Sequence, residues 1–276
     1  MLDDGIVDEV VRQLKSGKEA SVYVVRCGAE VRCAKVYKDM AQRSFQQRAQ
    51  YQEGRKVRGS RDARAMAKST RFGRKEQEAA WKNAEVDALY QLVAAGVRVP
   101  RPFGFFNGVL LMELVADDDG QSAPRLGEVV LSSDVALEYH QFLIGQIVRM
   151  LCSGLIHGDL SEFNVLIGAD GPVIIDLPQA VNAAGNNNAF AMLDRDVRNI
   201  TTTLGQFAPE LLATAYAAEM WSLFELGELQ PQTQLTGRFA VDDATPDLGE
   251  VMLAIDEARD EAIRREEGRT EAASRE

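Results

Sequence analysis

Apolar and polar residues alternate near the start of the chain with a period of two, which is typical of β-strands. This alternation predicts three short strands, at residues 10–14, 21–25 and 30–37. A hairpin is predicted over residues 105–115, because the central pair Asn107-Gly108 suits the tight turn that joins two antiparallel strands. Together these segments predict a small antiparallel sheet in the first half of the chain.

Elsewhere the apolar residues recur with the longer period of an α-helix. One such segment, residues 77–92, lies between the third strand and the hairpin. A longer amphipathic pattern at 134–155 predicts the central helix of a second lobe, and residues 189–218 predict two further helices. A last helix is expected to begin near residue 251, and residues 266–276 are expected to form a frayed tail.

This order of elements predicts an α+β fold with two lobes. The acidic, polar run at 116–122 follows an apolar strand and is typical of a hinge. We therefore expect an N-lobe at 1–115, with an antiparallel sheet and one helix, and a mainly helical C-lobe at 116–240. An acidic C-terminal helix and tail are expected at 241–276. With 276 residues, 46% of them hydrophobic, the chain can bury a full core.

Composition argues against several classes of protein. No apolar run approaches the roughly 20 residues that span a bilayer. The acidic N-terminus is unlike a signal peptide, so we expect a soluble, cytoplasmic protein. The three cysteines show no Cys-x-x-Cys spacing, which argues against a disulfide framework and a structural zinc site. Only two histidines are present, which argues against histidine-rich metal chemistry as the function.

Charge is unevenly distributed along the chain. The formal net charge is −11, yet residues 41–75 contain eleven basic and two acidic residues, a local charge of +9. A basic segment in an acidic protein is a candidate contact for a polyanion. The alternative, to which we give equal weight, is a solvated loop without a partner, since runs of like charge often interact only with water.

Two carboxylates and a carboxamide in the second half of the chain have the layout that phosphoryl transfer needs. Asn164 follows Asp159 by five positions, and Asp176 ends the apolar strand that comes later. Asp159 can act as the base or orienting group for an incoming hydroxyl, while Asn164 and Asp176 supply hard oxygen ligands for Mg2+. Asp and Asn also suit ordinary turns. The apolar strands at 165–167 and 173–175 favour the catalytic interpretation, because they hold the polar groups at the rims of a hairpin.

Lys35 lies in an otherwise apolar strand, where a charge is out of place unless it is used. The α- and β-phosphates of a nucleotide would use it, and Glu85 on the following helix can hold the ammonium group in place. The turn at 15–20 contains a glycine and small residues, so its backbone N–H groups can approach phosphate oxygens. The alternatives are a solvent-facing lysine on an edge strand and an exposed helix glutamate.

Four separate motifs follow the order used in protein kinase-like folds, and their amino-acid sequences resemble those of the RIO family of atypical kinases. Residues 16–23 (SGKEASVY) resemble its phosphate loop and 34–38 (AKVYK) its lysine strand. Residues 157–164 (HGDLSEFN) resemble its catalytic loop and 175–179 (IDLPQ) its metal loop. The basic segment at 41–75 is similar to the family's flexible loop. Because few residues precede the first strand, we expect the branch without an N-terminal winged helix.

The resemblance implies a two-lobed kinase fold that binds ATP with Mg2+ or Mn2+ and phosphorylates itself or protein serine. It also implies the alternative of an ATPase with an aspartyl-phosphate at Asp176. Asp159 and Asp176 would be catalytic, and Asn164 and Asp176 would hold the metal. The implied nucleotide-binding residues are Ser16, Gly17, Lys18, Glu19, Ala20, Ser21, Val22, Lys35, Glu85, Met112, Glu113 and Val115. Ser161 stands where most protein kinases have a lysine, which argues against efficient peptide phosphorylation.

Two other functions stay open. Family members mature the small ribosomal subunit, so the protein could be an assembly factor switched by ATP, with the basic segment on rRNA. A small-molecule kinase of the aminoglycoside or choline type also carries a His-Gly-Asp loop. Such enzymes usually have a second histidine near the position of Glu162 and a tryptophan or similar residue after the metal aspartate, whereas this chain has neither. His157 is expected to brace the catalytic loop through hydrogen bonds.

Overall fold

The computed structural model describes residues 5–17, 20–38 and 84–239. The chain divides into two compact units, Met1–Arg238 and Phe239–Glu276. The basic segment at 41–75, the C-terminal segment at 241–276, and Lys18 with Glu19 lie outside the described residues. What the sequence predicts for them therefore stays a prediction.

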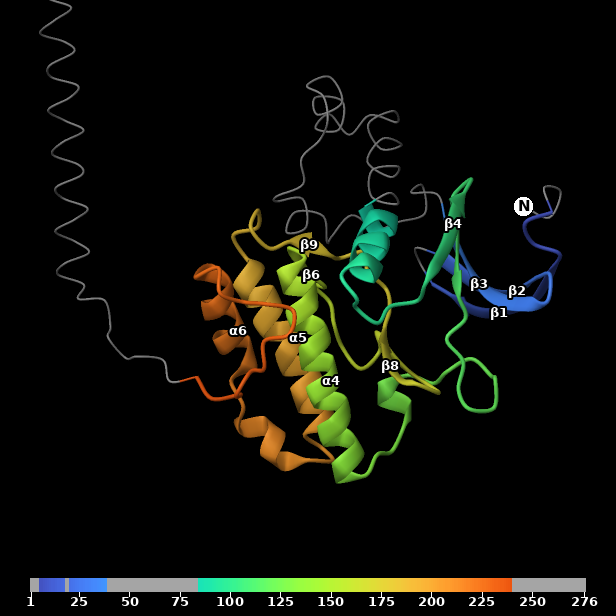
Figure 1. Ribbon diagram of the computed structural model, residues 1–276. Helices are drawn as coiled ribbons and strands as arrows, with labels where there is room; N and C mark the ends of the chain where they lie inside the picture. The colour runs from blue at the N-terminus through green and yellow to red at the C-terminus, as the bar shows by residue number, and fades with distance from the viewer. Residues whose placement is uncertain (1–4, 18–19, 39–83, 240–276) are drawn as a thin grey trace, which may run out of the picture. The chain divides into compact units, whose positions relative to one another are not determined.

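A five-stranded antiparallel sheet forms the N-terminal lobe (Figure 1). Its strands are β1 (Glu9–Ser16), β2 (Ala20–Cys27), β3 (Glu30–Tyr37), β4 (Pro102–Phe106) and β5 (Val109–Glu113). They lie in the order β1-β2-β3-β5-β4. Between β4 and β5, Asn107 (φ 48°) and Gly108 (φ 81°) both adopt left-handed backbone conformations, as a two-residue hairpin turn requires. The three predicted strands and the predicted hairpin are confirmed.

Strand β3 lies in the middle of the sheet, where Lys35 is paired with Val22 of β2 and Leu110 of β5. Residues 84–94 form a helix that buries Val86, Leu89 and Leu92 in the same apolar core as Tyr37 and Leu110. This helix therefore packs on the face of the sheet from which Lys35 and Tyr37 project, because residues two apart in a strand share a face.

The residues after β5 are mainly helical. The helices are α4 (Ser133–Cys152), α5 (Ala189–Leu204) and α6 (Tyr216–Glu225), with short 3-10 helices η2 (Leu126–Glu128) and η3 (Pro209–Ala213). Two small two-stranded sheets complete the lobe: β6 (Leu155–Ile156) pairs with β9 (Val181–Asn182), and β7 (Val165–Gly168) forms a hairpin with β8 (Gly171–Ile174). Of the helices that the structure describes, none has the length and apolar character needed to cross a bilayer.

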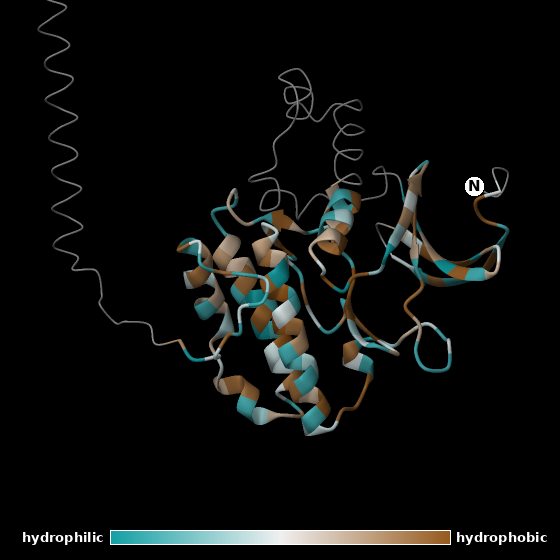
Figure 2. Ribbon diagram, in the orientation of Figure 1, coloured by the Kyte–Doolittle hydropathy of each residue, from teal (hydrophilic) through white to brown (hydrophobic). Residues whose placement is uncertain are grey.

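Helix α4 is the central element of this lobe, with α5 packed beside it (Figure 1). It begins at Ser132, whose hydroxyl accepts a hydrogen bond from Val135 N at 3.3 Å, a typical N-cap. Apolar and polar residues alternate along it with helical spacing (Figure 2). The predicted central helix is confirmed, but it ends at Cys152, because Gly154 (φ 82°) turns the chain into β6.

The prediction of two helices within residues 189–218 is only partly right. Helix α5 fills the first part of this range, whereas α6 begins at Tyr216 and continues to Glu225. Between them Pro209 starts the short η3 helix. Proline cannot donate a backbone hydrogen bond but suits the first position of a helix, which explains why a new short helix starts there.

A buried histidine joins α4 to the helices beside it. His140 Nε2 lies 2.9 Å from Thr201 Oγ1 of α5, and the His140 ring centroid lies 5.5 Å from that of Tyr216 in α6. The His140 side chain is only 1% exposed. Burial disfavours the charged imidazolium and lowers the pKa of His140 to about 4.

We predict that the free energy of unfolding falls as the pH drops from 6.5 towards 4. In this window the unfolded chain binds a proton at His140 and the folded protein does not, so the stability that is present above pH 6.5 is progressively lost. At about pH 5 the expected loss is about 2 kcal/mol, since one unit of pKa difference corresponds to about 1.4 kcal/mol. Denaturant unfolding at pH 7 and pH 5 measures it. His140→Gln should lose less stability over this interval, and an identical loss in both proteins would contradict the account.

Candidate active site

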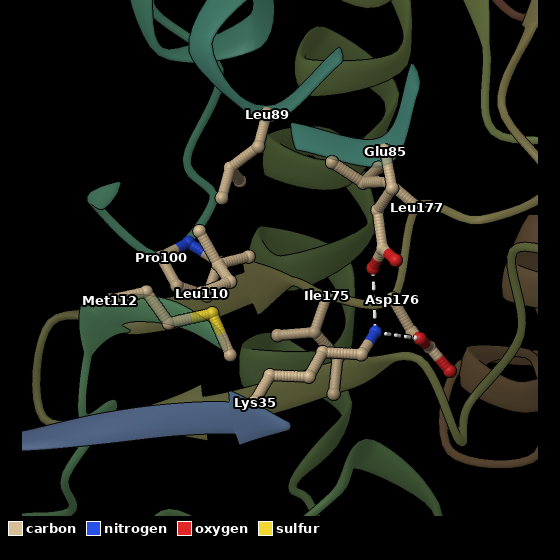
Figure 3. Close-up of a pocket in the computed structure, with 9 residues that line it drawn as sticks. All are labelled: Lys35, Glu85, Leu89, Pro100, Leu110, Met112, Ile175, Asp176 and Leu177. Atoms are coloured by element: carbon tan, nitrogen blue, oxygen red, sulfur yellow. Dashed lines mark hydrogen bonds and ion pairs between the residues drawn. The ribbon is translucent and has the colours of Figure 1, made fainter. Parts of the chain in front are cut away.

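Lys35 of β3 lies between two carboxylates (Figure 3). Its Nζ is 2.6 Å from Glu85 Oε1 and 2.8 Å from Asp176 Oδ1. The side chains of Lys35 and Glu85 are 11% and 5% exposed. This excludes the two alternative interpretations, a solvent-facing lysine on an edge strand and an exposed helix glutamate. Burial alone would lower the pKa of Lys35, but the charges of Glu85 and Asp176 outweigh it and raise this pKa. The lysine is therefore a cation at neutral pH.

Tyr37 is part of the same cluster, and sequence reasoning missed it. Its ring centroid lies 5.5 Å from Lys35 Nζ. Burial raises the pKa of the Tyr37 phenol, and the neighbouring Glu85 carboxylate raises it further, so the hydroxyl stays protonated. Because Tyr37 lies two residues after Lys35, it shares that face of β3.

Asp176 has an unusual backbone conformation that aims its side chain. Its φ of 67° is in the left-handed region, which costs a non-glycine residue about 1 kcal/mol or more. The preceding residue is held on both sides: Ile175 N donates to Asn164 O at 2.9 Å, and His157 Nε2 lies 3.0 Å from Ile175 O. Burial alone would raise the pKa of Asp176, but Lys35 lowers it, so the carboxylate is ionised.

Asn164 is oriented so that its amide oxygen stays available. Its Nδ2 donates to the carbonyl of Asp159 at 2.8 Å, which turns Oδ1 away from the loop backbone. The hydrogen bond from Ile175 N to Asn164 O brings Asn164 beside the residue that precedes Asp176. One backbone hydrogen bond therefore joins Asn164 to the residue directly before Asp176, the other predicted metal ligand. An amide oxygen and an ionised carboxylate are ligands that fit Mg2+.

Protein groups alone do not complete a metal site in the described part of the chain. No group of three or more His, Cys, Asp or Glu side chains there could hold an ion. Mg2+ usually keeps few protein ligands and takes the rest from water and substrate phosphates. Two ligands beside the cationic Lys35 thus suit an ion that arrives with a phosphorylated substrate.

Two hydrogen bonds of His157 brace the loop that carries Asp159, as expected. Its Nδ1 accepts from Asp159 N at 3.3 Å, and its Nε2 lies within hydrogen-bond distance of Ile175 O. Asp159 itself is exposed, in contrast to the buried His157, and so is accessible to an acceptor.

Asp196 of α5 holds the same loop by hydrogen bonds to its backbone. It is 1% exposed and accepts hydrogen bonds from Gly158 N at 2.7 Å and Leu160 N at 2.9 Å. Arg195 donates to the carbonyl of Gly158, and Asn199 Nδ2 donates to that of Leu160 at 2.9 Å. Burial raises the pKa of Asp196, although the two amide donors oppose the rise. The sequence contains a signal for this role, because the charged Asp196 falls on the apolar stripe of its helix.

The phosphate loop and the lysine strand are neighbours in the sheet. Gly17 N donates to Ala20 O at 2.9 Å, which closes the turn between β1 and β2. The hydroxyls of Ser16 and Ser21 lie 3.4 Å apart across it. Lys18 and Glu19 lie outside the described residues, whereas Val22 is paired directly with Lys35. The described part of this loop therefore lies where a phosphate next to Lys35 would meet it.

Met112, Glu113 and Val115, three of the predicted nucleotide-binding residues, lie where β5 leads into the hinge predicted at 116–122, and we call residues 112–122 the hinge region. Their environments differ. Met112 lines the hollow shown in Figure 3. The Glu113 side chain does not line it and instead forms an ion pair with Arg98, 2.7 Å away, so only its backbone is available to a nucleotide. Val115 is buried, and its backbone N–H makes no hydrogen bond to another described residue. A buried donor of this kind is well placed for an acceptor on a ligand.

The hollow between the lobes is small. Its wall includes Lys35, Glu85, Met112 and Asp176 (Figure 3), and its volume is about 30 Å³. Ligand pockets usually enclose about 300 Å³ or more. This hollow is thus smaller than a nucleotide needs, and Lys35 is bound to Asp176 in its wall.

Lys35 on a five-stranded sheet pairs with Glu85 on the helix that packs against it. This pair faces the part of the helical lobe that presents Asp159, Asn164 and Asp176. The arrangement defines the protein kinase-like class of folds. A family model described as the RIO domain matches residues 21–217. The chain belongs to the RIO family.

Several curated proteins and a solved structure are similar to this chain. The RIO-type serine/threonine-protein kinase Rio1 of Haloferax volcanii is 34% identical over 206 residues, which cover 72% of this chain and 64% of that protein. The human serine/threonine-protein kinase RIO1 is 31% identical, with coverage of 72% and 34%. The Rio2 kinase–ADP/Mg2+–phosphoaspartate complex from Chaetomium thermophilum has a TM-score of 0.48 and 25% identity, covering 71% of this chain and 56% of that one. The chain thus spans less than two thirds of these relatives.

We predict that Asp196→Asn destabilises the loop that carries Asp159. A carboxamide can accept from one of the two backbone N–H groups but presents its own N–H2 to the other, which leaves a buried donor without a partner at a cost of about 1–3 kcal/mol. Denaturant unfolding measures the difference. The control is Asp194→Asn on the same helix, where the pair with exposed Arg198 is worth less than about 1 kcal/mol. Equal stability of Asp196→Asn and the wild type would contradict the assigned role.

Proposed function

We propose that this protein is a Mg2+-dependent ATP phosphotransferase of the RIO type. The observation that carries the proposal is the contact of Lys35 with Glu85 and Asp176 across the cleft. It brings together a cation suited to the α- and β-phosphates and an ionised carboxylate suited to the metal. Phosphoryl transfer depends mainly on positioning and charge neutralisation, and these groups supply both.

Each residue has a distinct part in the proposed reaction. Lys35 exchanges Asp176 for the phosphates while Glu85 continues to hold the ammonium group. Asp176 and the Oδ1 of Asn164 would hold the metal, Mg2+ or Mn2+, which would neutralise charge on the phosphates. Asp159, exposed and fixed by its loop, orients the acceptor hydroxyl and takes its proton. The N–H of Val115 suits the edge of the purine.

For the acceptor, we propose serine, either on this protein or on another one. The curated relatives bear the name serine/threonine-protein kinase, which supports this choice. The alternative product is an aspartyl-phosphate at Asp176, followed by hydrolysis, so that the protein acts mainly as an ATPase. The two products differ chemically, because an acyl phosphate is cleaved by hydroxylamine and a phosphoserine is not. Family membership disfavours a small-molecule kinase of the aminoglycoside or choline type.

We predict that Asp159→Ala lowers ATP turnover by about 10²-fold or more, because removal of a general base typically costs that much. The measurement uses γ-labelled ATP and follows both label on the protein and free phosphate. Asp170→Ala, in the exposed turn between β7 and β8, is the matched control and should retain full turnover. Absence of both labelled protein and free phosphate with the wild type would contradict the proposed function, and full turnover by Asp159→Ala would contradict the role of Asp159.

We also propose that the basic segment at 41–75 contacts ribosomal RNA, so that ATP turnover switches binding to a ribosomal particle. Its local charge of +9 supports this partner. Sedimentation with ribosomal particles should show binding that weakens steeply as salt rises, because each neutralised phosphate releases counterions. A variant with Arg55, Lys56, Arg58 and Arg61 replaced by Gln should bind more weakly and show a shallower salt dependence. No co-sedimentation of the wild type at low salt would contradict the proposal.

A further inference from the structure

Arg98 lies in the segment that leads from the helix at 84–94, which carries Glu85, to β4. Its backbone is held by the helical lobe on both sides: its N–H donates to Gln146 Oε1 of α4 at 2.7 Å, and its carbonyl accepts from Ile174 N of β8 at 3.0 Å. Gln146 is only 5% exposed. Ile174 precedes Asp176 by two residues. The backbone of Arg98 is therefore fixed to the strand that leads to the proposed metal ligand.

The side chain of Arg98 reaches in the other direction, to the hinge. Its guanidinium donates to both oxygens of Glu113, over 2.7 Å to Oε1 and 2.9 Å to Oε2, which is bidentate geometry. Glu113 Oε2 also accepts from Arg101 N at 3.0 Å. Burial alone would raise the pKa of Glu113, but the hydrogen bonds from Arg98 and Arg101 lower it, so the carboxylate is ionised.

Glu113 is the last residue of β5, which is hydrogen-bonded to the strand that carries Lys35. One residue, Arg98, thus contacts the hinge, the central helix and the strand before Asp176. The side chains of Arg98 and Glu113 are 33% and 29% exposed, so water screens much of their attraction. The pair is better suited to fixing geometry than to supplying stability, because two parallel hydrogen bonds define the angle between the groups.

We propose that Arg98 is a positioning residue that keeps the nucleotide-binding hinge in register with Asp176. This inference rests on the proposed function. A nucleotide must displace the contact of Lys35 with Asp176, and the two halves of its site lie on different lobes. Through Arg98, the hinge that receives the base and the strand that presents the metal ligand move as one unit, so that the metal reaches a phosphate already in place.

The coupling between metal and nucleotide tests this role. ADP binding is measured by calorimetry with and without Mg2+, in the wild type and in Arg98→Lys. Lysine keeps the charge and every backbone hydrogen bond but cannot form the bidentate pair. In the wild type, Mg2+ should strengthen ADP binding. In Arg98→Lys the ratio of the two dissociation constants should fall by about fivefold, a typical coupling between sites, with little change in the affinity for ADP alone.

Two further variants complete the experiment. Glu113→Gln removes the charge and one of the two acceptor oxygens, so the bidentate ion pair cannot form and the same ratio should fall. This variant decides the question if Arg98→Lys does not fold. Arg26→Lys is the control, because its pair with Glu9 is 49% and 59% exposed and joins β1 to β2, neither of which is hydrogen-bonded to β5. A purely structural defect would lower the melting temperature without changing the ratio, since a ratio of affinities does not depend on the folded fraction.

Each outcome has a defined meaning. If Mg2+ strengthens ADP binding in the wild type and the ratio is unchanged in Arg98→Lys and Glu113→Gln, the role of Arg98 is overturned and the proposed function stands. If ADP binds equally well with and without Mg2+ in the wild type, no coupling exists and the inference is also overturned. If the wild type does not bind ADP under either condition, the proposed function fails and the inference fails with it.

Discussion

The cation of Lys35 sets the main constraint on this structure. An ammonium group that is 11% exposed needs carboxylate partners, and Glu85 and Asp176 supply them from two different parts of the chain. Removing one partner of a buried pair typically costs about 3–5 kcal/mol, because it leaves an uncompensated charge. The Nζ atom of Lys35 therefore links three elements: β3, the helix at 84–94 and the residues that follow the β7–β8 hairpin.

The second half of the site depends on close packing beneath the catalytic loop. Gly158 adopts a φ of 79°, and a Cβ there would approach Gln179 O to 2.7 Å and Met192 Cε to 2.8 Å. Only glycine fits this position without displacement of its neighbours. With Gly158 so close to α5, the carboxylate of Asp196 can accept from two loop amides, and Asp159 is held outward while its supports stay buried. The exposure of Asp159 and the burial of Gly158 and Asp196, which hold its loop, therefore follow from the same packing.

Local patterns predicted the elements of the fold, because alternation, helical spacing and the Asn107-Gly108 turn depend on neighbouring residues. Lys35 could be singled out since its charge conflicts with an apolar strand. Asp196 could be singled out in the same way, since its charge falls on the apolar stripe of α5. What Asp196 and Arg98 bind could not be predicted, because their partners lie far along the sequence: Asp196 binds Gly158, 38 residues earlier, and Arg98 binds Gln146, 48 residues later. Glu113 illustrates the same limit, since the resemblance named it as a nucleotide-binding residue but did not show that its side chain turns to Arg98.

The central claim is that Lys35 exchanges one of its two partners when a nucleotide binds. In this structure it neutralises Asp176, which is also a proposed metal ligand, so metal binding and release of the lysine must occur together. A crystal structure of the protein with ADP and Mg2+ tests this most directly. The account predicts Lys35 Nζ on a phosphate oxygen and still on Glu85, with Asp176 and Asn164 on the metal. Lys35 still bound to Asp176, with the nucleotide and metal elsewhere, would contradict it.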